Sequence, residues 1–189
     1  MTEERIRDME AFIAKAQGNV THVRRVHLIA QILAEREKIG YDADVLAFAA
    51  YFHDLGYYPP YNPGGAFDHA THSAKLMPPL AREWGLDEKQ IEIVVEAVEN
   101  HNKPGIGRFA ETRLLRNADG IDYLGYMAVA RDFAKSGNDM RRAMADLGRR
   151  KEMFGSLIDL ESAKKIAEPR LRELDDFIAR FEEESHGIY

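Results

Sequence analysis

The chain has 189 residues, a formal charge of −6, 45% hydrophobic residues and no cysteine, which predicts one soluble globular domain over residues 1–189. Without cysteine there can be no disulfide, thiolate nucleophile, zinc finger or iron–sulfur cluster, so any metal ligands must be His, Asp or Glu. The acidic balance disfavours a nucleic-acid polymer as partner. Because no long apolar run is present, we expect no membrane association and a cytoplasmic location.

Apolar residues recur three and four apart through nearly the whole sequence, which predicts an all-α fold. We expect helices over residues 3–17, 21–39, 43–53, 68–84, 87–101, 110–136, 138–154 and 159–184. The residues expected to cap them are Thr21, Asp42 or Asp44, Asp68 and Asp87 with Gln90. Pro169 predicts a kink or break in the last helix.

Two segments rich in proline and glycine separate these helices, and we expect both to be loops. The first covers residues 57–65 and follows the most apolar helix of the chain, which ends at His53-Asp54. The second covers residues 102–107. We find no repeat, linker or low-complexity segment that would indicate a second domain.

Several titratable residues fall on the apolar, core-facing side of different helices. His22 shares a face with Val26, Ile29, Ala30 and Leu33. His101 follows Val94 and Val98 in the same way, and Asp119 shares a face with Asp122. Taken singly, each histidine is better explained as a hydrogen-bonded core residue than as a ligand, and Asp119 is explained equally well as an ion-pair partner of Arg113 or Arg116. Together these groups are better explained by a divalent cation, which would bind them all.

Three segments carry a resemblance to a known family. His22-Val23-Arg24-Arg25-Val26, then His53-Asp54-Leu55-Gly56, then Ala118-Asp119-Gly120-Ile121-Asp122 resemble the H…HD…D signature of the HD-domain metal-dependent phosphohydrolases, particularly the small single-domain type. The resemblance implies a compact helical bundle with a metal site between its central helices. The signature region would cover about residues 19–135, with the helices of residues 136–189 packed on it.

The resemblance implies that His22, His53, Asp54 and Asp119 are the primary metal ligands. His69 and His101 would complete a dinuclear site in which Asp54 bridges the ions. One or two divalent ions are expected, and Mn, Fe, Co, Ni, Zn and Mg are all candidates. His72 lies one turn from His69, and we favour His69 as the inward residue. His27 and His186 are expected to have no role in the site.

The chemistry expected of such a site is hydrolysis of a small phosphate ester or phosphoanhydride, nucleotide-like, by a metal-activated water. The candidate catalytic residues are Asp54, Asp122, Arg25 and Lys103. The candidate substrate contacts are His69, His101, Arg25 and Lys103, although Arg25 and Lys103 are equally well explained as solvated charges. The expected partner is a small phosphorylated substrate, and a homodimer stays open.

Three other functions stay open on the same scaffold. A mixed-valent di-iron oxygenase would use the same six ligands, and Lys103 behind His101 is suggestive of that class. The second is a hydrolase or hydratase that acts on a non-phosphate substrate. The third is a degenerate domain without catalysis, which the intact ligand set argues against.

Overall fold

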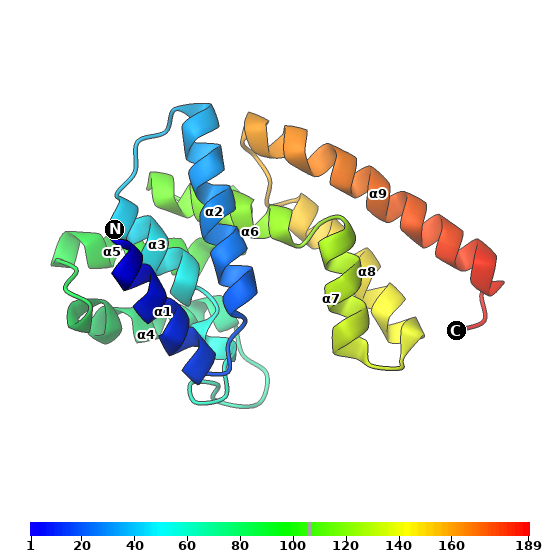
Figure 1. Cartoon of the computed structure of the whole chain (residues 1–189), viewed down its shortest axis with the longest axis horizontal. Coiled ribbons are helices and arrows are strands. Elements are labelled where there is room, and N and C mark those ends of the chain that lie inside the picture. The colour runs from blue at the N-terminus through cyan, green and yellow to red at the C-terminus, as the bar shows by residue number, and fades with distance from the viewer. Residues whose placement is uncertain (106) are drawn as a thin grey trace.

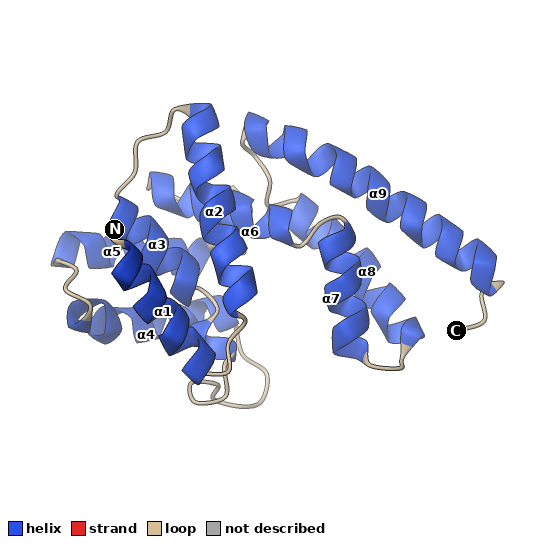
Figure 2. Ribbon diagram, in the orientation of Figure 1, coloured by secondary structure: helices blue, strands red, loops and turns tan. Residues whose placement is uncertain are grey.

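The computed structural model describes residues 1–105 and 107–189, and Ile106 of the expected loop 102–107 lies outside the described residues. Over the described residues the chain forms nine α-helices, one short 3₁₀ helix and no strand (Figure 2). The helices are α1 (Glu3–Lys15), α2 (Val20–Glu37), α3 (Ala43–Phe52), η1 (Leu55–Tyr57), α4 (His69–Glu83), α5 (Glu88–Asn100), α6 (Ala110–Asp122), α7 (Tyr126–Ser136), α8 (Met140–Gly155) and α9 (Glu161–Ser185). The all-α prediction is confirmed. Among these helices, none combines the length and apolar character that crossing a bilayer requires.

Helices α1 to α6 enclose the main hydrophobic core, with α3 near its centre (Figure 1). Every residue of α3 from Val45 to Phe52 is buried, as its uninterrupted apolar run predicts. Helix α2 contacts α3 and α6, and α5 contacts α3, α4 and α6. This arrangement brings the end of α3 close to the inner faces of α2, α5 and α6.

Helices α7, α8 and α9 form a second, smaller hydrophobic cluster on the other side of α6 (Figure 1). Tyr123 and Phe154 stack within it, with ring centroids 3.9 Å apart. Helices α8 and α9 also contact α6, and α9 contacts α2. The C-terminal helices therefore lie against the helices of the signature region. The single domain over residues 1–189 stays a prediction.

The polar residues before the helices cap them much as the sequence indicates. Asp42, Asp68 and Asp87 accept hydrogen bonds from the first backbone N–H groups of α3, α4 and α5, and Gln90 completes a capping box with Asp87. For α2 the cap is Asn19, whose side chain accepts from the backbone N–H of His22 at 3.1 Å, so the expectation of Thr21 was wrong. This cap fixes the first turn of the helix that carries His22.

The single helix predicted for residues 110–136 is two helices, so that expectation was wrong. Gly125 adopts a φ of +71° and a ψ of −158°, which a helix cannot contain and which only glycine adopts readily. The chain therefore turns after Asp122 and begins α7 at Tyr126. Conversely, α9 continues through Pro169 without a break, because Ala163, Ala167 and Leu174 on either side of it are buried and packing compensates for the lost hydrogen bond.

Candidate metal centre and adjoining cavity

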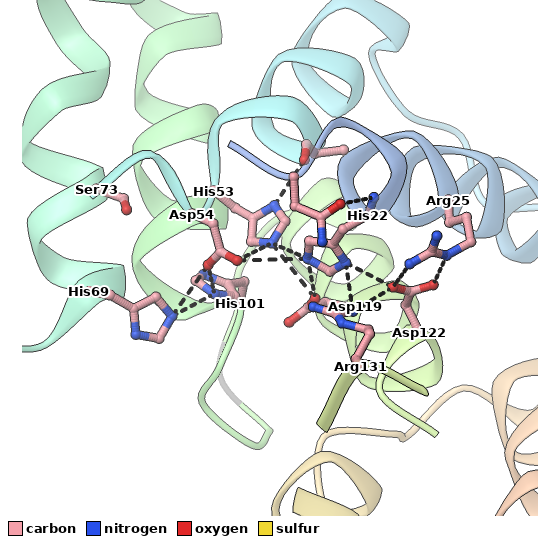
Figure 3. A network of polar contacts seen from close by, with 12 residues as sticks. His22, Arg25, His53, Asp54, His69, Ser73, His101, Asp119, Asp122 and Arg131 are labelled. Carbon is pink, nitrogen blue, oxygen red and sulfur yellow. Dashed lines mark hydrogen bonds and ion pairs between the residues drawn. The ribbon is translucent and has the colours of Figure 1, made fainter. Parts of the chain in front are cut away.

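His22 of α2 and His53 at the end of α3 point their Nε2 atoms at each other, 3.3 Å apart (Figure 3). The Nδ1 atom of His22 lies 2.8 Å from Asp122 Oδ2, and that of His53 lies 2.9 Å from the carbonyl oxygen of Ala50. Because each Nδ1 must donate to its oxygen, each Nε2 is the nitrogen left to bind a proton or a cation. The two buried Nε2 atoms face each other, and a shared proton or cation would stabilise the pair.

Asp54 lies between two groups of histidines (Figure 3). Its Oδ2 atom is 3.7 Å from His22 Nε2 and 3.6 Å from His53 Nε2. Its Oδ1 atom is 3.6 Å from His69 Nε2 and 3.9 Å from His101 Nε2. The two carboxylate oxygens thus face two different pairs of imidazoles, the arrangement expected of a residue that bridges two ions.

Asp119 of α6 completes the first group. Its Oδ1 atom is 3.3 Å from His22 Nε2 and 3.7 Å from His53 Nε2. This oxygen is buried and makes no hydrogen bond within the described part of the chain. Burial raises the pKa of Asp119, but the close approach and charge of His53 outweigh it and lower the pKa to about 2. Asp119 is therefore a buried carboxylate that keeps its negative charge.

The donor set fits a divalent cation. His101 resembles His53, because its Nδ1 lies 2.6 Å from the carbonyl oxygen of Val98 and leaves Nε2 free. Burial, and the charge of His53, lower the pKa of His101 to about 4, so its imidazole is neutral. Although burial lowers the pKa of His53, the charges of Asp54 and Asp119 raise it to about 9. At a pKa of about 9 the His53 imidazole holds a proton at neutral pH while no cation is bound, and a bound cation would take the place of that proton. Imidazole nitrogens and ionised carboxylates that converge on one point are the donors that a transition-metal site uses.

The groups brought together are the six expected ligands, His22, His53, Asp54, His69, His101 and Asp119, which come from five segments of the chain. Subsets of them, His22 with His53 and Asp119, and His53 with Asp54 and His101, place their donor atoms within 4.8 Å of one another. The expectation that these helices direct titratable groups inward thus agrees with their placement. Their roles as ligands stay predictions.

Asp122, one turn after Asp119, lies behind His22 rather than beside the other donors. Besides the hydrogen bond from His22, it accepts two from Arg25, at 2.6 and 2.9 Å, and one from Arg131, at 2.9 Å. Burial raises the pKa of Asp122, but the hydrogen bonds from His22 and Arg25 outweigh this and hold it far below the usual range. Asp122 is thus an ionised group that orients His22.

The donor set opens into a cavity of about 750 Å³, within the range of small-molecule sites. Its lining includes four cationic side chains from α7 and α8: Arg131, Lys135, Arg149 and Arg150. The described lining includes neither Arg25 nor Lys103, so the geometry does not favour their expected role as phosphate contacts. Arg25 is engaged with Asp122, and the charge of Lys103 acts on Asp68, whose pKa it helps to lower.

The remaining histidines lie where the sequence suggests. His69 faces the donor set, whereas His72 turns away, with its Nε2 2.8 Å from the carbonyl oxygen of Tyr61. His27 packs against the ring of Tyr51, and His186 lies in the C-terminal segment, exposed. Neither of the last two contributes to the described lining of the cavity.

Sequence reasoning missed the cationic wall of the cavity. Arg131 follows Asp122 by nine residues, beyond the last of the three segments that carry the resemblance. Arg149 and Arg150 sit on an amphipathic helix whose charges resemble an ordinary solvated face. The sequence signal that could have indicated this wall is Gly125, because a helix break there turns the chain so that α7 lies beside the site.

The fold and this site together define the class of protein. The family model for the HD domain matches residues 19–130, more than half of the chain. The chain therefore belongs to the HD-domain family, and the resemblance in its motifs is confirmed. Among curated proteins, none matches the sequence significantly.

Solved structures from bacteria share this fold. A predicted HD superfamily hydrolase from an uncultured Thermotogales bacterium is 25% identical, with a TM-score of 0.65 over 94% of this chain and 91% of its own. An HD-superfamily hydrolase from Bacillus thuringiensis is 24% identical, with a TM-score of 0.69 over 97% of this chain and 98% of its own. YpgQ of Bacillus subtilis is 19% identical, with a TM-score of 0.73 over 98% of both chains. The fold is thus that of the HD superfamily hydrolases.

Proposed function

We propose that the protein is a metal-dependent phosphohydrolase that cleaves a small phosphate ester or phosphoanhydride with a nucleotide-like body. The observation that carries this proposal is the position of Asp54. Its two oxygens face two pairs of imidazoles, and the same carboxylate lines a cavity with four cationic side chains. A site with this composition suits a small anionic substrate that binds a metal cation and reacts with water.

The residues divide the work by position. His22, His53, Asp54 and Asp119 would hold one divalent ion, and His69 and His101 would join Asp54 in holding a second. A divalent cation bound there lowers the pKa of water towards neutrality and offsets negative charge on phosphoryl oxygens. The buried imidazoles supply neutral ligands, and the two carboxylates balance the charge of the cation, which also makes an acidic chain compatible with an anionic substrate.

Asp122 serves as a positioning residue in this scheme. Its bonds to His22, Arg25 and Arg131 occupy both of its oxygens. It therefore keeps His22 in the tautomer with Nε2 free, and we assign it no proton transfer.

A nucleotide-like body suits the side of the cavity opposite the cationic wall. The ring of Tyr57 lines the cavity, stacks on His69 at 4.2 Å between centroids and is half exposed, so it offers aromatic surface to a planar group. Tyr58 also lines the cavity, while Tyr61 packs on Phe12. A solved structure of Bacillus subtilis YpgQ, 20% identical with a TM-score of 0.70, is a complex with ADP. That is a property of YpgQ, and it agrees with the substrate class proposed.

The experiment that tests the proposal is a hydrolysis screen on protein stripped of metal and reloaded with Mn, Co, Ni, Mg, Zn or Fe(II). Phosphate release from nucleoside phosphates and simple phosphoesters should require one of these ions. It should disappear in His53→Ala and Asp54→Ala. Activity that survives in those variants would show that the reaction takes place elsewhere.

A di-iron oxygenase would use the same six donors, and the screen separates the two. The lysine that would favour the oxygenase, Lys103, is not part of the described lining of the cavity, which favours hydrolysis. Electron paramagnetic resonance of aerobically purified protein is the direct check. A coupled di-iron signal without any phosphoester turnover would contradict the phosphohydrolase proposal.

A further inference from the structure

Arg131 of α7 differs from the other two arginines of the cavity in how it is paired. Arg149 pairs with Asp146, and Arg150 pairs with Asp132. Arg131 has only a share in Asp122, which accepts both hydrogen bonds of the Arg25 side fork as well as the one from Arg131 Nη1. Two guanidinium groups therefore share one carboxylate within ion-pair distance.

The unused part of Arg131 is the side fork made by Nε and Nη2. Arg25 directs the same two nitrogens at the two oxygens of Asp122. In Arg131 neither atom has an acceptor among the described residues, and Nε is buried. A buried donor without an acceptor is costly, and this fork matches a carboxylate or phosphate in geometry and charge.

Arg131 lines the cavity, and its surroundings hold its guanidinium group in place. The side chain of Arg131 is only 11% exposed, and its guanidinium carbon lies 3.9 Å from the centroid of the Tyr123 ring. Nη1 is anchored on Asp122 beside His22 (Figure 3). Its 3.2 Å approach to His22 Nδ1 follows from sharing Asp122 Oδ2, since both nitrogens are donors. The guanidinium is therefore fixed before any ligand arrives, which lowers the entropy cost of binding.

We propose that Arg131 is the anion-binding residue of this cavity: its Nε and Nη2 hold an anionic oxygen pair of the substrate while Nη1 stays on Asp122. Arg131 thus takes the role of phosphate contact that the sequence suggested for Arg25 and Lys103. That the anion is a phosphate rests on the proposed function. Arg25 keeps Asp122 in place when Arg131 is changed, so loss of Arg131 weakens anion binding and leaves the hold on His22 intact.

The test measures binding of inorganic phosphate by calorimetry, on manganese-loaded and on chelator-treated protein. Arg131→Gln should raise the dissociation constant for phosphate about 10- to 100-fold, as expected for a lost charge-assisted pair. Arg131→Lys, which keeps the charge but not the fork, should fall between wild type and Arg131→Gln. Arg24→Gln removes the same charge from an exposed pair with Glu10, and we expect it to change the constant less than about 2-fold.

Metal content, circular dichroism and steady-state kinetics complete the design. Metal content and fold should be unchanged in Arg131→Gln, and KM for any phosphoester found should rise more than kcat falls. A phosphate dissociation constant equal to that of wild type would overturn the role of Arg131 and leave the phosphohydrolase proposal standing. Phosphate binding that depends on Arg131, in a protein that hydrolyses no phosphoester with any ion, would support Arg131 and sink the phosphohydrolase. Absence of phosphate binding by wild type in both states would overturn the assignment of Arg131.

Discussion

Asp122 Oδ2 accepts a hydrogen bond from His22 Nδ1 at 2.8 Å, and the two residues are a hundred positions apart in the chain. The bond fixes which nitrogen of His22 carries the proton and turns the other towards His53 and Asp119. The orientation of a candidate metal ligand on α2 is therefore set by a carboxylate on α6, which is itself held by two arginines. This carboxylate–histidine pair links the fold to the chemistry of the site.

Asp122→Asn should weaken metal binding about 10- to 100-fold, the usual effect of changing the partner of a metal-binding histidine. The amide has no charge for Arg25 and Arg131, so the free energy of unfolding should also fall, by about 1–3 kcal/mol. Titration with manganese and denaturation in urea measure the two effects.

Asp159→Asn is the matched control for that variant. Asp159 accepts hydrogen bonds from Arg113, Arg116 and Asn117, away from the cavity lining. We expect a loss of stability with unchanged manganese affinity. Equal losses of manganese affinity in both variants would mean that Asp122 acts only through stability.

The two histidines of α4, His69 and His72, should differ in their effect on metal affinity. His69→Ala should lower the affinity for one bound ion, because its Nε2 lies 3.6 Å from Asp54 Oδ1 and 3.2 Å from His101 Nε2. His72→Ala removes the bond to the carbonyl oxygen of Tyr61 and should loosen the loop after η1 while metal affinity stays unchanged. Calorimetric titration with manganese compares the two, and a larger effect for His72→Ala would reverse the assignment.

His27 should make the protein less stable in mild acid. Burial lowers its pKa from 6.5 to about 4, so between these values the unfolded chain binds more protons than the folded chain. The free energy of unfolding therefore falls as pH drops through this window, by about 1–2 kcal/mol. The neighbouring Tyr51 and Arg24 both donate hydrogen bonds to Glu10 and form a network of their own.

Urea denaturation between pH 7 and pH 4.5 tests this contribution. His27→Gln should flatten the pH dependence relative to wild type. His186→Asn, which replaces an exposed histidine of the C-terminal segment, should leave the dependence as it is. If His27→Gln and wild type have parallel profiles, burial does not hold this imidazole neutral.

Gly125 should tolerate no side chain. An added Cβ would lie 3.2 Å from the side chain of Arg170, at a φ of +71°, so Gly125→Ala should lower the free energy of unfolding by about 1–3 kcal/mol. Gly148→Ala in α8 meets no neighbouring atom and should stabilise the chain by about 0.5–1 kcal/mol. Urea midpoints of the two variants should shift in opposite directions, and a shared direction would contradict the backbone argument.

The inward side of each helix could be predicted from the sequence because the helical period is local. His22 with Val26, and Asp119 with Asp122, follow from spacings of three and four. The sequence also predicts that the most apolar helix ends at His53-Asp54. These local rules predict that the donor residues lie on the inner faces of their helices. That the six residues belong to one site was implied by the family resemblance.

What could not be predicted depends on how distant segments meet. The helical pattern of apolar residues continues across residues 110–136, so it did not predict the break at Gly125. Without that break, the position of Arg131 beside the site could not be predicted. Arg25 and Asp122 are 97 residues apart, and nothing local indicates that they pair. Of the kink or break that Pro169 predicts in α9, the structure excludes the break, because the helix continues from Glu161 to Ser185. The missed pairing of Arg25 with Asp122 is a tertiary contact, whereas the cap of α2 and the break at Gly125 are local features that the sequence pattern did not resolve.

Metal analysis of protein reloaded with manganese is the most direct test of whether His53 and Asp54 help to hold a catalytic divalent ion. Wild type should retain one or two ions per chain after desalting, and should hydrolyse phosphoesters only in that state. His53→Ala and Asp54→Ala, folded by circular dichroism, should retain almost none and show no turnover. Metal content in the variants equal to that of wild type would contradict the account.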